Sequence, residues 1–304
     1  MFGYRCKGEI KTIEVRDDLV AVGCSDGWIH VFDGDGILWS KKLTATYYRD
    51  PYTDVNVISA DINDKYVAIG TDFMDGKVYL FTLDGELVWY KQFLCIVGCW
   101  ERPEDIVAVA VDTDRVAACS EWLNGTLHVM DVDGRTVEER DLDGSIKDLI
   151  MWNGAVVGTS RALYLNELKL NISANKILTH KNELYVSNAN GVYAVNGKAE
   201  MLYSCRQPLI SVSDKFVAVY DGIKLSMISK NGDVIWEIIP DKQISTLYCV
   251  KECVYAGHTN GIDIVEGGEV TEKIQIDGEP VHIGKVVVCV DKEDGREVKV
   301  YRMF

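Results

Sequence analysis

The sequence predicts an all-β fold built from eight copies of one small unit. Strand-like apolar runs recur along the chain, each ends in a glycine hairpin, and a second strand follows the hairpin. The clearest copies are VAVGCSDGWIHVFDGDGILW from Val20, VAIGTDFMDGKVYLFTLDGELVW from Val67 and VAACSEWLNGTLHVMDVDGRTV from Val116. A unit of three or four short strands cannot bury its apolar faces alone, so the copies are expected to stack around an axis.

The spacing of the turn glycines supports a single repeat. Two series recur in steps of 49 residues, namely Gly27, Gly76 and Gly125, and then Gly36, Gly85 and Gly134. Downstream, steps of 31, 39 and 34 residues separate Gly191, Gly222, Gly261 and Gly295. Glycine is expected there because two-residue hairpins need a positive φ, which is costly for a residue with a Cβ. The pattern predicts a β-propeller whose blades differ in loop length.

Eight four-stranded blades are predicted, and they begin near Gly8, Val55, Asp105, Gly144, Asn171, Pro208, Gln243 and Glu279. In the first blade the strands are IKTIEV, LVAVGCS, WIHVFD and ILWSKKL, and the apolar second strand is typical of one buried between neighbours. The last unit supplies only three strands, so residues 2 to 7 are expected to form its outer strand and close the ring. Seven blades are the alternative, if residues 144 to 170 form no blade. Repeats running end to end predict one domain over residues 1–304.

The charge balance bears on the partners. The chain has 47 Asp and Glu against 32 Lys and Arg, a net charge of −15 with an isoelectric point of about 4.8. Phosphate backbones and anionic lipids are bound by clustered Lys and Arg, so neither nucleic acid nor a membrane is an expected partner. Acidity is interpreted first as a source of solubility, and attraction of basic partners is the alternative.

Location and source are also predicted from composition. No apolar run approaches the roughly 18 residues of a membrane span. MFGYRCKGEIKTIEV, at the start of the sequence, lacks the apolar segment of a secretory signal, so a cytoplasmic location is expected. Glutamine occurs only four times, which favours a heat-adapted source.

Nine cysteines are present, and an unexported protein is expected to keep them reduced. Core positions in second strands are expected for Cys24, Cys119, Cys253 and Cys289, where cysteine acts as a small hydrophobe. Cys249 pairs with Cys253 at CxxxC spacing and is interpreted as core. Cys95 and Cys99 share that spacing in an inserted loop, where a disulfide or a metal stays open although structural zinc usually takes four ligands.

The turns carry a family resemblance. HVFDGDGILW, YLFTLDGELVW and LSMISKNGDVIW combine an Asp-Gly or Asn-Gly turn with Trp39, Trp89 or Trp236. These segments resemble the repeats of the quinoprotein-like (PQQ-repeat) propellers, a group close to the WD40-like propellers. Blade three departs from the pattern with Val137 in the Trp position. The resemblance implies the fold, and the group includes enzymes, assembly factors and scaffolds.

Structural roles account for these turn residues. The tryptophans are expected to be wedges between blades. Asp33, Asp35, Asp131 and Asp133 are interpreted as turn formers rather than a calcium loop, because the twelfth place counted from Asp33 or from Asp131 holds no glutamate.

Catalytic signatures are absent from the sequence. GxSxG, P-loop and HExxH motifs do not occur, and the Cys-Cys dipeptide of the quinoprotein dehydrogenases is also missing. The five histidines lie in different blades without ligand spacing, and His30 and His128 hold equivalent positions. No catalytic residue, cofactor or metal is therefore predicted. The alternative is a small-ligand-binding or hydrolytic enzyme with a site at the central channel, where carboxylates from several blades could converge.

Long loops in blades one to three predict a binding surface. TATYYRDPYTD, LCIVGCWERPE, TDFMDG and SEWLNG belong to loop classes that share one face of a propeller, and they are rich in residue types that dominate interfaces. The predicted partner-binding residues are Tyr47, Tyr48, Arg49, Tyr52, Phe73, Met74, Trp100, Arg102, Trp122 and Leu123. The main hypothesis is a non-catalytic scaffold or adaptor that docks a protein or peptide there. The alternative is that these side chains turn inward and plug the channel.

Overall fold

The computed structural model describes residues 2–45, 54–122, 125–291 and 295–302. In these residues the regular structure consists of β-strands, arranged in eight four-stranded sheets and one two-stranded sheet. None of them forms a helix long and apolar enough to cross a membrane. The chain divides into two compact units, mainly residues 4 to 169 and mainly residues 170 to 304.

The first unit contains four blades, and in each the strands follow one another in chain order. Blade one is β2 (Ile10–Arg16), β3 (Leu19–Cys24), β4 (Trp28–Phe32) and β5 (Ile37–Lys42). Blade two is β6 (Val57–Ile62), β7 (Tyr66–Thr71), β8 (Lys77–Thr82) and β9 (Leu87–Gln92). Blade three is β12 (Asp105–Val111), β13 (Arg115–Glu121), β14 (Gly125–Asp131) and β15 (Thr136–Leu142). Blade four is β16 (Ile146–Met151), β17 (Ala155–Thr159), β18 (Leu163–Leu165) and β19 (Leu168–Leu170).

The second unit contains blades five to seven and most of blade eight, whose strand β1 (Phe2–Arg5) lies mostly in the first unit. Blade five is β20 (Lys176–His180), β21 (Glu183–Asn188), β22 (Gly191–Val195) and β23 (Ala199–Ser204). Blade six is β24 (Leu209–Val212), β25 (Phe216–Tyr220), β26 (Leu225–Ser229) and β27 (Val234–Ile238). Blade seven is β28 (Ile244–Val250), β29 (Cys253–His258), β30 (Gly261–Glu266) and β31 (Glu269–Ile274). Blade eight is β32 (Glu279–Ile283), β33 (Val286–Val290), β34 (Glu297–Arg302) and β1 (Phe2–Arg5).

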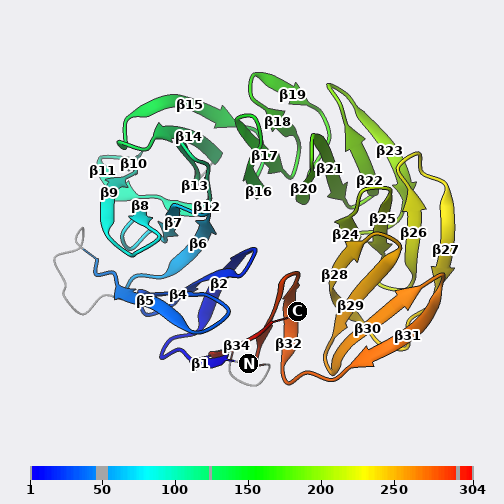
Figure 1. Ribbon diagram of the computed structural model, residues 1–304. Helices are drawn as coiled ribbons and strands as arrows, with labels where there is room; N and C mark the ends of the chain where they lie inside the picture. The colour runs from blue at the N-terminus through cyan, green and yellow to red at the C-terminus, as the bar shows by residue number, and fades with distance from the viewer. Residues whose placement is uncertain (1, 46–53, 123–124, 292–294, 303–304) are drawn as a thin grey trace. The chain divides into compact units, whose positions relative to one another are not determined.

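The eight-bladed β-propeller predicted from the repeats is confirmed. β16 to β19 form a complete sheet, so the alternative of seven blades is excluded. β1 is hydrogen-bonded to β34, and the two ends of the chain therefore meet in one sheet, as the incomplete last unit predicted (Figure 1).

The burial pattern explains the strand order within a blade. In blade one, β3 is almost entirely buried, whereas the outer strand β5 is exposed or half-buried along its length. Ile29, Val57 and Ile69 are buried in one cluster that joins blades one and two. Apolar second and third strands thus form the core, and each outer strand needs only a partly apolar pattern.

The tryptophans of the turn motif pack between neighbouring blades and connect them, as predicted. Trp39 Nε1 donates a hydrogen bond to the Leu83 carbonyl in the next blade at 2.8 Å. Gly85, at φ 85°, lies flat against the Trp39 indole, and a Cβ there would lie 2.9 Å from the ring. Trp89 Nε1 repeats the contact on the Val132 carbonyl at 2.8 Å. The Asp-Gly turn therefore receives the tryptophan of the preceding blade.

The repeated aspartates form turns, as predicted. Asp33 Oδ1 accepts hydrogen bonds from the backbone N–H groups of Asp35 and Gly36 at 2.8 and 2.9 Å. Asp131 Oδ1 does the same for Asp133 and Arg135 at 3.0 and 2.9 Å. These carboxylates are engaged by their own loops, which is the usual role of short acidic side chains in turns.

Candidate docking surface

A β-hairpin stands between blades two and three, where the sequence predicted only a loop. β10 (Leu94–Val97) and β11 (Trp100–Pro103) form a separate two-stranded antiparallel sheet. Gly98, at φ 65°, lies in its turn with open space around its Cα. The expectation of an irregular loop was wrong because CIVGCW carries a short strand, a glycine turn and a second strand without clear alternation of apolar and polar residues.

The base of the hairpin is fixed to blade two. The Phe93 N–H donates to the Gly76 carbonyl at 2.8 Å, and the Glu104 N–H donates to the Phe93 carbonyl at 3.1 Å. Phe93 and Pro103 are buried, and a Cβ on Gly76 would come within 2.4 Å of Pro103 Cβ. This close approach requires glycine at the end of the β7–β8 turn. The hairpin thus projects from a rigid base.

Arg102 joins three of the predicted loops. Its guanidinium carbon lies 4.1 Å from the ring centroid of Trp122 and 6.0 Å from that of Phe73. Phe73 lies in the β7–β8 turn and Trp122 follows β13, so the arginine ties the hairpin to blades two and three. A guanidinium stacked on an aromatic face is attracted by the ring quadrupole, which stabilises this geometry.

The turn that carries Phe73 is held by two carboxylates. Asp105 Oδ1 accepts from the Phe73 N–H at 2.8 Å, and Asp72 Oδ1 accepts from the Met74 N–H at 3.3 Å. Burial raises the pKa of Asp72, although hydrogen bonds from Asn56 oppose the shift. Because these contacts fix the backbone, Phe73 is presented at a defined position.

The tip of the hairpin is apolar and exposed. Ile96 and Trp100 are 78% and 74% exposed, and Leu94 and Phe73 are also exposed. In the hairpin register Val97 pairs with Trp100 and Cys95 with Arg102, so these four side chains share one face. Ile96 lies on the other face. Trp100 therefore extends from the same side as the arginine cluster, and Ile96 is exposed on the reverse side beside its register partner Glu101.

The structure brings together part of the surface predicted from the sequence. Phe73, Arg102 and Trp122 are in contact, and Trp100 lies on the same hairpin face, while half-buried Met74 is next to Phe73. Trp100 is exposed, so its side chain does not turn inward to plug the channel. The other predicted residues lie outside the described part of the chain, namely Tyr47, Tyr48, Arg49, Tyr52 and Leu123. We call the set Phe73, Leu94, Ile96, Trp100, Arg102 and Trp122 the hairpin surface.

A buried ion pair below the hairpin was not found from the sequence. Lys77 Nζ lies 2.7 Å from Asp75 Oδ1, and the two side chains are 3% and 0% exposed. The Tyr79 hydroxyl donates to Asp75 Oδ2 at 2.6 Å, and Gln92 Nε2 donates to the Asp75 carbonyl at 2.9 Å. The sequence signal for this network was the segment DGKVY, in which the alternate residues Asp75, Lys77 and Tyr79 share one face. This network stiffens the end of blade two from which the hairpin projects.

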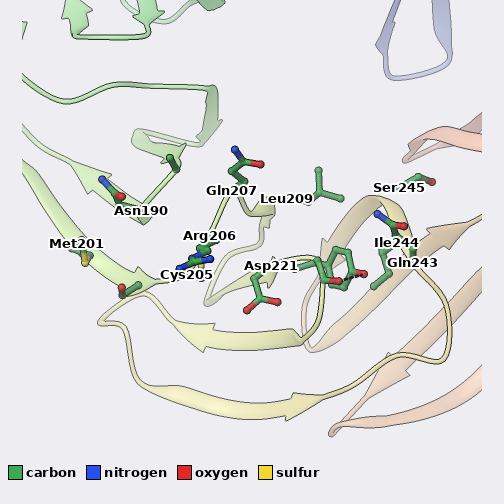
Figure 2. Close-up of a pocket in the computed structure, with 14 residues that line it drawn as sticks. Asn190, Met201, Cys205, Arg206, Gln207, Leu209, Asp221, Gln243, Ile244 and Ser245 are labelled. Carbon is green, nitrogen blue, oxygen red and sulfur yellow. Dashed lines mark hydrogen bonds between the residues drawn. The ribbon is translucent and has the colours of Figure 1, made fainter.

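A pocket of about 890 Å³ lies elsewhere, among the loops of blades five to seven. Figure 2 shows that its lining residues come from separate loops, including Asn190, Arg206, Gln207, Asp221 and Gln243. Asp221 Oδ1 accepts hydrogen bonds from the backbone N–H groups of Ile223 and Lys224 at 2.9 and 2.7 Å, so it caps a turn. Asp221 and Arg206 are the charged side chains of the described lining, which suits binding of a polar molecule better than paired-carboxylate catalysis.

The cysteines mostly follow the sequence expectation. Cys24, Cys119 and Cys289 are buried, as predicted. Cys253 is only half-buried and donates its thiol hydrogen to Glu266 Oε1 at 2.7 Å, so its assignment to the core was wrong. Cys95 lies in β10 and Cys99 in the hairpin turn, and both are free thiols in the structure.

Eight four-stranded sheets of this connectivity define the class of protein as a β-propeller. No protein-family model matches the sequence, and no curated protein matches it either. Solved propellers are nevertheless similar in structure. BamB from Moraxella catarrhalis has a TM-score of 0.69 at 12% identity, covering 100% of this chain and 99% of its own.

Two further solved structures are similar over nearly the whole chain. The Dos1 propeller has a TM-score of 0.67 at 13% identity and covers 99% of this chain and 94% of its own. A chain of the Mitotic Checkpoint Complex has a TM-score of 0.56 at 12% identity, covering 100% of this chain and 95% of its own. At these identities the likeness establishes the fold, and it confirms the resemblance to propellers inferred from the turn motifs.

Proposed function

We propose that this chain is a non-catalytic scaffold or adaptor that docks a protein or peptide partner on the hairpin surface. The observation that carries the proposal is the exposure of Ile96 and Trp100 on opposite faces of one projecting hairpin. Large apolar side chains gathered at such a tip are typical of interaction sites, and tryptophan and arginine are enriched among residues that dominate binding energy.

The form of the hairpin favours a partner that covers it. A two-stranded sheet is marginally stable in water by itself, and this one is held chiefly at its base. Within the described residues, β10 and β11 pair only with each other, so each has an outer edge open to an added strand. An extended apolar segment of a partner could pair with that edge and cover Ile96 or Trp100.

The arginine cluster supports the same proposal through rigidity. Arg102 holds Trp122 and Phe73 in place before any partner arrives, so little side-chain freedom is lost on binding. Tyr47, Tyr48, Arg49, Tyr52 and Leu123 belong to the proposed surface on their sequence positions alone.

Composition and structural similarity support the kind of partner and the location that we propose. A similar chain belongs to the Mitotic Checkpoint Complex, which is an example of this fold within a protein assembly. The net charge of −15 disfavours nucleic acid and membrane surfaces as partners. A cytoplasmic location and a heat-adapted source are part of the proposal.

Affinity purification from the source organism tests the docking surface. The double variant Ile96→Ser/Trp100→Ser should lose a partner that the wild-type chain recovers. The matched control is Ile223→Ser/Ile239→Ser, which removes two exposed apolar side chains of the second unit, 67% and 72% exposed. Equal recovery by the hairpin variant, with the melting temperature unchanged, would refute this surface.

The pocket of blades five to seven supports a second candidate function, which is binding of a small polar ligand. Arg206 is the cation among its described lining residues, so an anionic group is the expected feature of the ligand. Thermal-shift measurements with citrate and inorganic phosphate test this candidate. Stabilisation that disappears in Arg206→Ala supports it, and an unchanged melting temperature with both anions counts against it. A site at the central channel remains a prediction from the sequence.

A further inference from the structure

Two sulfur atoms and an imidazole nitrogen converge inside blade one. The sulfurs of Cys6 and Cys24 and a ring nitrogen of His30 all lie within 4.8 Å of one another. The three residues are 3%, 0% and 2% exposed. Cys6 follows β1, Cys24 ends β3 and His30 lies in β4, so the cluster joins three separate segments. Each of these side chains is a common metal ligand.

His30 Nε2 is buried without a hydrogen-bond partner among the described residues. The other ring nitrogen, His30 Nδ1, forms a 2.8 Å hydrogen bond with Ser40 Oγ, and the Tyr4 ring covers the imidazole at 4.6 Å between centroids. Metal-bound histidines are usually oriented in this way by a hydrogen bond to the second nitrogen.

Blade three supplies an internal comparison. His128 pairs with Ala118 as His30 pairs with Val22, so Ser120 occupies the place of Cys24. There, the Ser120 hydroxyl and His128 Nε2 form a hydrogen bond of 3.1 Å. In blade three a single hydroxyl thus lies beside the histidine. Packing of the blade does not account for two sulfurs at the equivalent place in blade one.

We propose that Cys6, Cys24 and His30 bind a Zn²⁺ ion. Two thiolates and an imidazole supply three of the four ligands of tetrahedral zinc, and a water molecule is a common fourth ligand. Zinc binds the thiolate form of cysteine, so binding would release the thiol protons of Cys6 and Cys24, and the two thiolates would balance the charge of the ion. It would also tie the segment that follows β1 to β3 and β4 through Cys6.

Metal binding by the full-length chain tests this site. The protein is reduced, stripped with a chelator and titrated with Co²⁺ and then with Zn²⁺ in competition with a chromophoric chelator. One equivalent of Co²⁺ should give thiolate-to-cobalt charge-transfer absorption, and Zn²⁺ should displace it and raise the melting temperature.

Two variants make the result specific to the site. Cys24→Ser should fold, because Ser120 occupies the equivalent position in blade three, and it should lose the stoichiometric binding. Cys289→Ser removes a buried cysteine of β33 and should bind like the wild type. Absence of binding by the reduced wild type, formation of a Cys6–Cys24 disulfide in place of binding, or full binding by Cys24→Ser would overturn the proposal.

Discussion

The Arg102 guanidinium lies 4.1 Å from the centre of the Trp122 ring, and this contact connects the hairpin to blade three. The two residues are far enough apart in the chain that only the fold brings them together. The base residues fix the position of the hairpin. The contact between Arg102 and Trp122 sets its orientation, because it fixes which face of the hairpin lies against blade three.

Removing the arginine should loosen the hairpin surface. Arg102→Ala is expected to lower the free energy of unfolding by about 0.5–2 kcal/mol, the range of a cation–π contact. The fluorescence of Trp122 should shift towards that of a solvated indole. Arg206→Ala, which removes an exposed arginine of the pocket, should stay within about 0.5 kcal/mol of the wild type in chemical denaturation. Equal effects of both substitutions would contradict the role given to Arg102.

The turn glycine at position 85 should be intolerant of a side chain. Gly85→Ala adds a methyl group 2.9 Å from the Trp39 ring, at φ 85°. We expect the strain of a positive φ, about 1–2 kcal/mol, plus about 1–3 kcal/mol from overpacking. Gly197→Ala is the control, since Gly197 has φ 68° and open space around it, and should show only the backbone cost. Denaturant unfolding of both variants measures the difference, and equal costs would exclude the indole contact as its cause.

Breaking the buried ion pair should destabilise blade two strongly. Asp75→Asn removes the carboxylate that the buried Lys77 ammonium contacts at 2.7 Å, which costs about 3–5 kcal/mol. The double variant Asp75→Asn/Lys77→Met removes both charges and should recover much of that loss. A double variant no more stable than Asp75→Asn would show that the ion pair is not the cause.

The stability of the protein should fall at alkaline pH. Burial, followed by the hydrogen bond to Asp75, raises the pKa of Tyr79, and burial followed by Glu183 raises the pKa of Tyr185. A raised pKa in the folded state means that the neutral phenol is favoured, so its stabilising effect is present below the unfolded pKa of about 10 and is lost above it. Denaturation midpoints between pH 9 and 12 measure the slope, which should be shallower in Tyr79→Phe. An identical slope would contradict the assignment to Tyr79.

The fold could be predicted from the sequence because the residues that indicate its turns and strands are close together in the chain. Glycine turns such as that at Gly85, aspartate loops such as that at Asp33 and apolar second strands each depend on a few neighbouring residues. The pairing of β1 with β34 followed by counting strands, since a three-stranded last unit needs a fourth.

The candidate sites were less accessible to the sequence. Trp100 and Arg102 were recognised by residue type, but the stacking of Arg102 on Trp122 depends on tertiary structure. Cys6 and His30 gave no signal, because no ligand spacing connects the segment after β1 with β4. The tertiary structure brings them together.

Site-specific photo-crosslinking from the hairpin tip tests the docking proposal most directly. A benzophenone amino acid is placed at position 100 in one sample and at position 239 in another, and both are irradiated in lysate of the source organism. We predict one discrete crosslinked protein from position 100 and none from position 239. A lack of crosslinks from position 100, or the same products from both positions, would contradict the hairpin surface as the docking site.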